Sequence, residues 1–213
     1  MKRSFFCRLR GAVVLLIALG LPAAATAAPP AASLTEQDRA DVARVESYLN
    51  GIDTLRARFL QVSSDGGYAE GNLYIDRPGQ MRIDYDPPVP VVVVANGNWL
   101  IYLDIKLQQV THIPLGSTPA GILLRENPRL SGEVTITGFE RAADALRITL
   151  VRTRDPAEGN LTLVFSDRPL LLRKWSVIDA QGVETSVSLM ETHFGEPLKR
   201  SLFELELPET PRD

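Results

Sequence analysis

From residue 55 to residue 191, hydrophobic and polar residues alternate with a period of two over most of the chain. This alternation is typical of β-strands that have one buried face and one face in water. It is clearest in Gln80–Asp86, where Met81, Ile83 and Tyr85 alternate with charged residues. We predict eleven main strands and a short one, at Leu55–Ser63, Tyr68–Asp76, Gln80–Asp86, Pro90–Ala95, Trp99–Asp104, Leu107–Ile113, Glu133–Phe139, Ala145–Thr153, Asn160–Ser166, Leu170–Ile178, Val183–Glu191 and near Phe203–Leu207.

Two segments have a helical pattern instead. Before the first strand, apolar residues recur at helical spacing behind Ser33-Leu34-Thr35-Glu36, a tetrapeptide that fits a capping box. These apolar positions are Val42, Val45, Leu49 and Ile52. The second segment, Thr118–Arg125, is apolar and has a proline where a helix would begin. We expect a short helix there, acting either as a lid or as a buried connector; its lid residues would be Pro119, Ile122, Leu123 and Leu124.

Turn residues separate the strands. Asn96-Gly97, which lies between two apolar runs, is the strongest hairpin signal in the chain. Mostly antiparallel strands with two isolated helices exclude a parallel nucleotide-binding sheet. We predict a mainly β (α+β) fold with one strongly curved sheet, whose concave face either closes as a barrel or is covered by the two helices.

The first 27 residues have the pattern of a secretory signal peptide. Basic residues precede the apolar run Ala12–Leu21, which is too short to span a bilayer, and Ala25-Thr26-Ala27 offers small residues for cleavage. We expect cleavage after Ala27 and a single domain over residues 28–213. The one cysteine, Cys7, precedes the cleavage site. The cleaved chain would therefore contain no disulfide and no lipid-modified cysteine.

Charge and motifs limit the function further. The chain after residue 27 has 19 Lys and Arg against 26 Asp and Glu, a net charge of −7. Such an acidic chain is a poor candidate for binding nucleic acid or anionic lipid surfaces. The histidines, His112 and His193, are isolated in sequence, and common hydrolase and phosphate-binding motifs are missing. We predict no enzyme, no metal site and no cofactor; a periplasmic hydrolase stays as a minor alternative.

Two neighbouring runs, Val91–Val94 and Trp99–Leu103, are apolar at every position. Strands of this kind are either buried on both faces in the core, or they line a ligand cavity with one face. The pattern alone favours the buried core.

The chain also contains an ordered series of motifs. They are Phe59-x-Gln61, Gly71-x-Leu73-Tyr74-Ile75-x-Arg77-Pro78-Gly79-x-Met81-Arg82-Ile83-x-Tyr85, Val91–Ala95 with Asn96-Gly97, Trp99-x-x-Tyr102, Gln108-x-x-Thr111, Thr118-Pro119 and Phe203-x-x-x-x-Pro208. In order and spacing this series resembles the LolA family, the periplasmic carriers of outer-membrane lipoproteins in Gram-negative bacteria. The resemblance covers nearly all of the chain after residue 27.

The resemblance implies an incomplete, strongly curved antiparallel β-barrel of about eleven strands covered by a helical lid. It implies a periplasmic monomer that takes triacylated lipoproteins from an inner-membrane ABC transporter and passes them to an outer-membrane receptor lipoprotein. Arg77 matches the family's Arg-Pro arginine, which holds the lid shut. We expect Arg77 to be the lid latch and to bond backbone carbonyls near residues 117–126.

The cavity would hold acyl chains. Its predicted lining is Leu73, Ile75, Met81, Ile83, Tyr85, Val91, Val93, Trp99 and Ile101. Met81 and Ile83 replace aromatic residues that are common in the family, which implies a differently shaped or more deformable cavity. The segment 127–132 shows little helical signal, so part of the cover is expected to be reduced.

Other functions remain open at this point. A lipid-binding receptor or a periplasmic stress sensor could use the same fold, but the first should carry a cysteine at its cleavage site and the second a further domain. A purely structural β protein would use its apolar strands as sealed core.

Overall fold

The computed structural model describes residues 29–205. The predicted signal peptide and its cleavage site lie outside this range. So does the end of the short strand predicted near Phe203–Leu207. The part of that segment inside the range is not a strand, because the chain forms the 3-10 helix η3 (Arg200–Phe203) and then two irregular residues.

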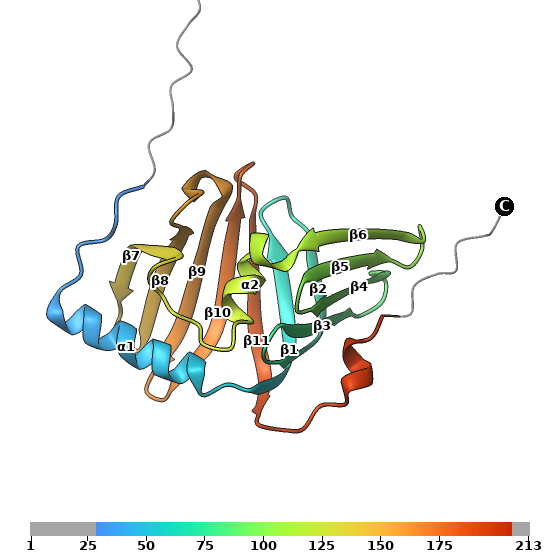
Figure 1. Ribbon diagram of the computed structural model, residues 1–213, viewed down its shortest axis with the longest axis horizontal. Coiled ribbons are helices and arrows are strands. Elements are labelled where there is room, and N and C mark those ends of the chain that lie inside the picture. The colour runs from blue at the N-terminus through green and yellow to red at the C-terminus, as the bar shows by residue number, and fades with distance from the viewer. Residues whose placement is uncertain (1–28, 206–213) are drawn as a thin grey trace, which may run out of the picture.

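Residues 29–205 contain eleven strands in one antiparallel sheet, in the order β6-β5-β4-β3-β2-β1-β11-β10-β9-β8-β7 (Figure 1). The strands are β1 Thr54–Ser63, β2 Tyr68–Asp76, β3 Gln80–Tyr85, β4 Val91–Asn96, β5 Trp99–Asp104, β6 Gln109–Pro114, β7 Val134–Arg141, β8 Ala145–Arg152, β9 Gly159–Asp167, β10 Leu170–Asp179 and β11 Glu184–Phe194. The edge strands β6 and β7 do not pair with each other, so the sheet stays open. This confirms the predicted incomplete barrel.

The strand order explains the position of the lid. Nearly every pair in the sheet is formed by consecutive strands, and the exception is β1, which pairs with β11 and joins the two halves. β6 and β7 are consecutive in the chain but lie at opposite edges. The connection between them must therefore cross the sheet. It does so through η1 (Leu115–Ser117), α2 (Pro119–Leu123) and an irregular segment, on the face that we call the inner face (Figure 1).

The helix α1 (Glu36–Asn50) packs on the inner face, across β7 to β10 (Figure 1). Its buried Val45 and Leu49 belong to the main hydrophobic core. Its capping box differs from the predicted one by two residues: the Asp38 amide donates to the Thr35 hydroxyl, and the Thr35 amide donates to the Asp38 carboxylate. The prediction of Ser33 as the cap was wrong, because aspartate at the third helical position closes the box as glutamate does.

The predicted helix after Thr118 is confirmed. The amide of Gly121 donates to the Thr118 hydroxyl at 3.2 Å, so Thr118 caps α2 and the following proline takes the first helical position. Residues 127–132 form no helix, as expected from their sequence. The cover of the inner face therefore consists of α1, α2 and the irregular segment that follows α2.

Asp41 fastens α1 to the sheet. Its side chain is 2% exposed and accepts hydrogen bonds from Arg44, one turn along the helix, and from Arg141 at the end of β7. Arg44 continues to Asp167 at 2.9 Å, at the end of β9. Burial opposes the charge on Asp41, but the bonds from Arg141 and Arg44 outweigh it and lower the pKa of the carboxyl below its usual 3.8.

Acid should therefore weaken the protein through Asp41. A carboxyl with a lowered pKa in the folded state stabilises the fold fully above its unfolded pKa, and that contribution is lost as pH falls through the folded pKa. We expect the free energy of unfolding, measured by urea denaturation, to fall as pH drops below about 4. Asp41→Asn should show a shallower decline, because its side chain does not titrate. Identical slopes in both proteins would contradict this role.

Candidate functional site

An apolar cavity of about 300 Å³ lies between the inner face of the sheet and α2. Its lining residues are Gln61, Ile75, Met81, Ile83, Tyr85, Val93, Leu100, Thr118, Leu123, Leu124, Leu161, Trp175, Val177, Thr185 and Val187. They come from both halves of the sheet and from the lid. Ligand cavities are typically lined in this way, by many apolar side chains and few polar ones.

Two of the polar groups in the cavity satisfy each other. The Tyr85 hydroxyl donates to the Gln61 side-chain oxygen at 2.8 Å. The Tyr85 ring also packs edge-on against Phe59, with 5.4 Å between ring centroids. Burial, with a smaller contribution from Tyr102, raises the pKa of the Tyr85 hydroxyl, so it stays a neutral donor. The cavity therefore offers a neutral and mostly apolar surface.

Several of the predicted residues line this cavity. From the strands these are Ile75, Met81, Ile83, Tyr85 and Val93, and from the lid Leu123 and Leu124. Leu73 and Val91 are instead buried in the surrounding hydrophobic core, where they are 1% and 7% exposed. Ile122 lines two neighbouring cavities, and Pro119 is the first residue of α2.

Trp99 and Ile101 do not line the cavity, so this part of the prediction was wrong. In the β4–β5 ladder, Leu100 is opposite Ala95 on the inner face, which turns Trp99 and Ile101 outward. Ile101 is buried on that outer face. The 3-10 helix η3 packs on the same face against β3 and β4, where Arg82 donates to the Leu202 carbonyl of η3 at 3.1 Å. A small second core on this side explains why both faces of β5 are apolar.

The C-terminal half of the sheet also contributes to the cavity, and the sequence did not predict this. Leu161, Trp175, Val177 and Val187 come from β9, β10 and β11. Their alternation correctly predicts strands. These four residues lie opposite the N-terminal lining only because β11 pairs with β1, which is more than a hundred residues away in the chain. No local sequence pattern predicts that pairing.

Arg77 bonds a different partner from the one predicted. Its Nη1 donates to the backbone carbonyls of Leu49 and Ile52, at the C-terminal end of α1, and not to residues 117–126. The last turn of α1 has no basic residue of its own, so Arg77 supplies the positive charge that these carbonyls favour. Burial lowers the pKa of the guanidinium, and its Nε is buried without a partner.

The lid is held instead by its own set of contacts. In the turn between β2 and β3, the Gly79 amide donates to the Leu124 carbonyl at 2.8 Å. Gly79 has φ +76°, and a Cβ there would lie 2.7 Å from the Gly97 Cα, so the close approach of the two hairpin turns requires glycine. Beyond α2, the Leu130 amide donates to the Glu46 side chain at 2.7 Å. Arg77 thus reaches the lid segment only through α1.

Two further observations concern residues 29–205. None of their helices is long and apolar enough to cross a bilayer. Within the same range, no group of three or more His, Cys, Asp or Glu side chains is arranged to hold a metal ion.

Residues 50–206 match the family model described as outer membrane lipoprotein carrier protein LolA. An outer-membrane lipoprotein carrier protein of Pseudomonas syringae pv. syringae is 30% identical over 181 residues, which cover 80% of this chain and 86% of the relative. One from Azotobacter vinelandii is 28% identical over 188 residues, which cover 84% and 90%. Among solved structures, a DUF1329 family protein from Desulfovibrio piger is similar in fold, with a TM-score of 0.50, 10% identity and coverage of 77% of this chain and 95% of that one.

Proposed function

Because the chain belongs to the LolA family of outer membrane lipoprotein carrier proteins, we propose that it binds the acyl chains of lipoproteins in the cavity between the sheet and α2. The single observation that carries this proposal is the apolar lining, to which both halves of the sheet and the lid contribute. Each methylene group that leaves water contributes ~0.8 kcal/mol, so acyl chains supply a large driving force without any charged contact.

The size of the cavity implies that α2 moves. Pockets for small ligands have volumes of about 300–1,000 Å³, so a cavity of about 300 Å³ is at the lower end of that range. Lipoprotein acyl chains need more room, which lifting of α2 and the adjoining segment would provide. The cost of opening subtracts from the affinity, and this is useful in a carrier that must release its cargo.

The apolar surface continues beyond the cavity toward β6. Leu100, which lines the cavity, is opposite Ile113 of β6, and Val93 is opposite Tyr102 of β5. Tyr102 and Ile113 are 40% and 38% exposed on this inner face. We propose that the part of an acyl chain nearest the lipoprotein polypeptide contacts these residues.

The wider transport role is also a proposal. We propose a periplasmic, single-domain monomer spanning residues 28–213; the signal-peptide pattern supports its export, and the names of the relatives support the carrier role. It would receive triacylated lipoproteins from an inner-membrane ABC transporter, deliver them to an outer-membrane receptor lipoprotein, and catalyse no reaction.

Native mass spectrometry tests the carrier role. The protein would be purified from the periplasm after co-expression with a lipoprotein, and separately with the same lipoprotein lacking its lipid-modified cysteine. We expect a one-to-one complex with the acylated form alone. No complex with the acylated form, or equal binding of the unacylated form, would contradict the proposal.

Arg77→Leu should slow release of the ligand. Without the guanidinium, the Leu49 and Ile52 carbonyls lose their donor and α1 holds the lid segment less firmly. The apparent affinity for a ligand rises when the open, binding-competent state is more populated. We therefore expect about three- to tenfold tighter binding of a fluorescent fatty acid and slower transfer of lipoprotein. Arg56→Leu is the control, because Arg56 is 47% exposed and pairs with Glu196. Unchanged affinity and release in Arg77→Leu would rule out the latch role.

A further inference from the structure

The lid is fastened differently to the two halves of the sheet. On the β2–β5 side both contacts are backbone hydrogen bonds, from Gly79 to Leu124 and from Leu115 to Asn98, each 2.8 Å long. On the opposite side the contact comes from a side chain. Nη2 of Arg152, the last residue of β8, donates to the Gly116 carbonyl in η1. A side chain can change partners by rotation, whereas a backbone amide cannot.

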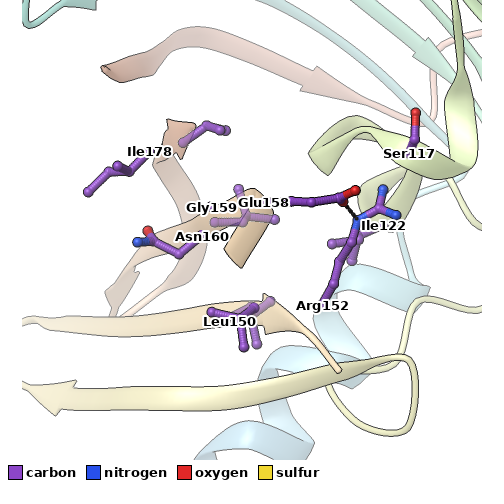
Figure 2. A pocket seen from close by; sticks show the side chains of 11 residues that line it. Ser117, Ile122, Leu150, Arg152, Glu158, Gly159, Asn160 and Ile178 are labelled. Atoms are coloured by element: carbon purple, nitrogen blue, oxygen red, sulfur yellow. Dashed lines mark ion pairs between the residues drawn. The ribbon is translucent and has the colours of Figure 1, made fainter. Parts of the chain in front are cut away.

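Arg152 has a second acceptor within reach. Its Nε is 3.5 Å from Oε2 of Glu158, which lies in the 3-10 helix η2 (Pro156–Glu158) between β8 and β9. Figure 2 shows this ion pair beside a small cavity, with Ser117 and Ile122 of the lid nearby. Arg152 is 26% exposed and Glu158 55%. The guanidinium therefore lies between a carbonyl that belongs to the lid and a carboxylate that stays with the sheet.

The surroundings leave room for the lid to move. A larger cavity of about 590 Å³ adjoins Gly116, Ile122 and Arg152. Arg125, an arginine of the lid segment that lines the same cavity, is paired with Glu133 and does not compete for Glu158. η1 and α2 thus border open space beside Arg152, and lifting them requires the buried Ile122 to leave its contacts.

We propose that Arg152 is a switchable clasp of the lid. In the closed state it holds the Gly116 carbonyl, and when the lid lifts it turns fully to Glu158. A half-buried guanidinium without an acceptor would make opening costly. Glu158 supplies that acceptor, so the cavity opens and closes reversibly. The relevance of this clasp to cargo rests on the proposed carrier function, but the clasp itself is a property of the empty protein.

Spin labels on the empty protein test the clasp. After cleavage the chain would have no cysteine, so Glu126→Cys and Ala143→Cys introduce one labelling site on the lid segment and one beside β7; both positions are exposed. Electron–electron distance measurements then report the open and closed populations. Arg152→Gln should raise the open-to-closed ratio about tenfold, the value of one hydrogen bond to a charged group.

Glu158→Gln distinguishes a switch from a simple hydrogen bond. The closed structure already has the Arg152–Glu158 ion pair at 3.5 Å beside the Gly116 bond, but only the open state relies on it fully. The substitution should therefore weaken the open state more, so that the open population falls, and it should have no further effect in the Arg152→Gln background. Arg147→Gln is the matched control, since Arg147 lies on the same strand but pairs with Glu140 in solvent. Unchanged populations in Arg152→Gln, or a Glu158→Gln shift toward the open state, would overturn the proposal. Neither result depends on whether lipoprotein binds, which native mass spectrometry measures separately.

Discussion

Replacing Asp41 with asparagine should lower the free energy of unfolding by about 2–3 kcal/mol. The carboxylate is 2% exposed and is bonded by two arginines, one from its own helix and one from β7. Asparagine has nearly the same shape, but it is neutral and turns an amide donor toward at least one guanidinium. The loss is therefore that of charge-assisted bonds, and the core packing stays intact.

Thermal unfolding followed by circular dichroism would measure the change. For a chain of this size, 2–3 kcal/mol corresponds to a decrease in Tm of roughly 4–12 °C. Asp144→Asn is a matched control, because it makes the same chemical change at a carboxylate that is 89% exposed and 4.0 Å from Arg168. If both variants lose equal stability, Asp41 has no special part in holding α1 to the sheet.

The helix α1 was predictable from the sequence, but the burial of Asp41 was not. The helical pattern predicts α1 and its buried apolar stripe, and both are present. An aspartate between helical apolar positions looks like a solvent-facing residue. Its burial depends on Arg141, a hundred residues later, being at the end of β7 beside the helix. That contact follows from the sheet order, which no local pattern contains.

Arg77 gives a similar lesson. Its place in an Arg-Pro-Gly turn between two lining strands predicts a position at the rim, and the family resemblance implied bonds to backbone carbonyls near residues 117–126. In the structure Arg77 bonds the carbonyls of Leu49 and Ile52 instead. Which covering segment it meets depends on how α1 ends. Gly51 closes that helix beside the turn, so the Leu49 and Ile52 carbonyls lie closer to Arg77 than those of α2. The rim position of Arg77 was predictable from the sequence, whereas the carbonyls that it contacts were not.

The orientation of β5 is harder to predict, because Trp99–Leu103 is apolar on both faces. Alternation fixes a strand's orientation only when one face is polar. Here Ile101 and Leu103 are buried on the outer face, while Leu100 lines the cavity on the inner face, so both sets of side chains are apolar for different reasons. Pairing decides the matter: Leu100 and Ala95 share the inner face.

Leu100→Asp should therefore abolish ligand binding, while Trp99→Asp should not. A carboxylate at position 100 would lie in the apolar cavity, where the desolvation penalty of an unpaired charge is several kcal/mol, so binding of a fluorescent fatty acid should weaken at least about 100-fold. Trp99 is 43% exposed on the outer face, and the same charge there should change the affinity less than about threefold.

The two substitutions are adjacent in one strand and add the same charge. A difference in binding between them therefore reports which face of β5 the ligand contacts, and not the effect of the added charge itself. Circular dichroism and Tm would first establish that both variants fold, because Leu100 also packs against the main core. Strong loss of binding in the folded Trp99→Asp protein, with binding retained in Leu100→Asp, would reverse the orientation assigned to β5. Loss in Leu100→Asp alone would place the ligand on the inner face of the sheet. There the cover is held by Arg77 through α1 and by Gly79 and Arg152 through the segment that contains α2.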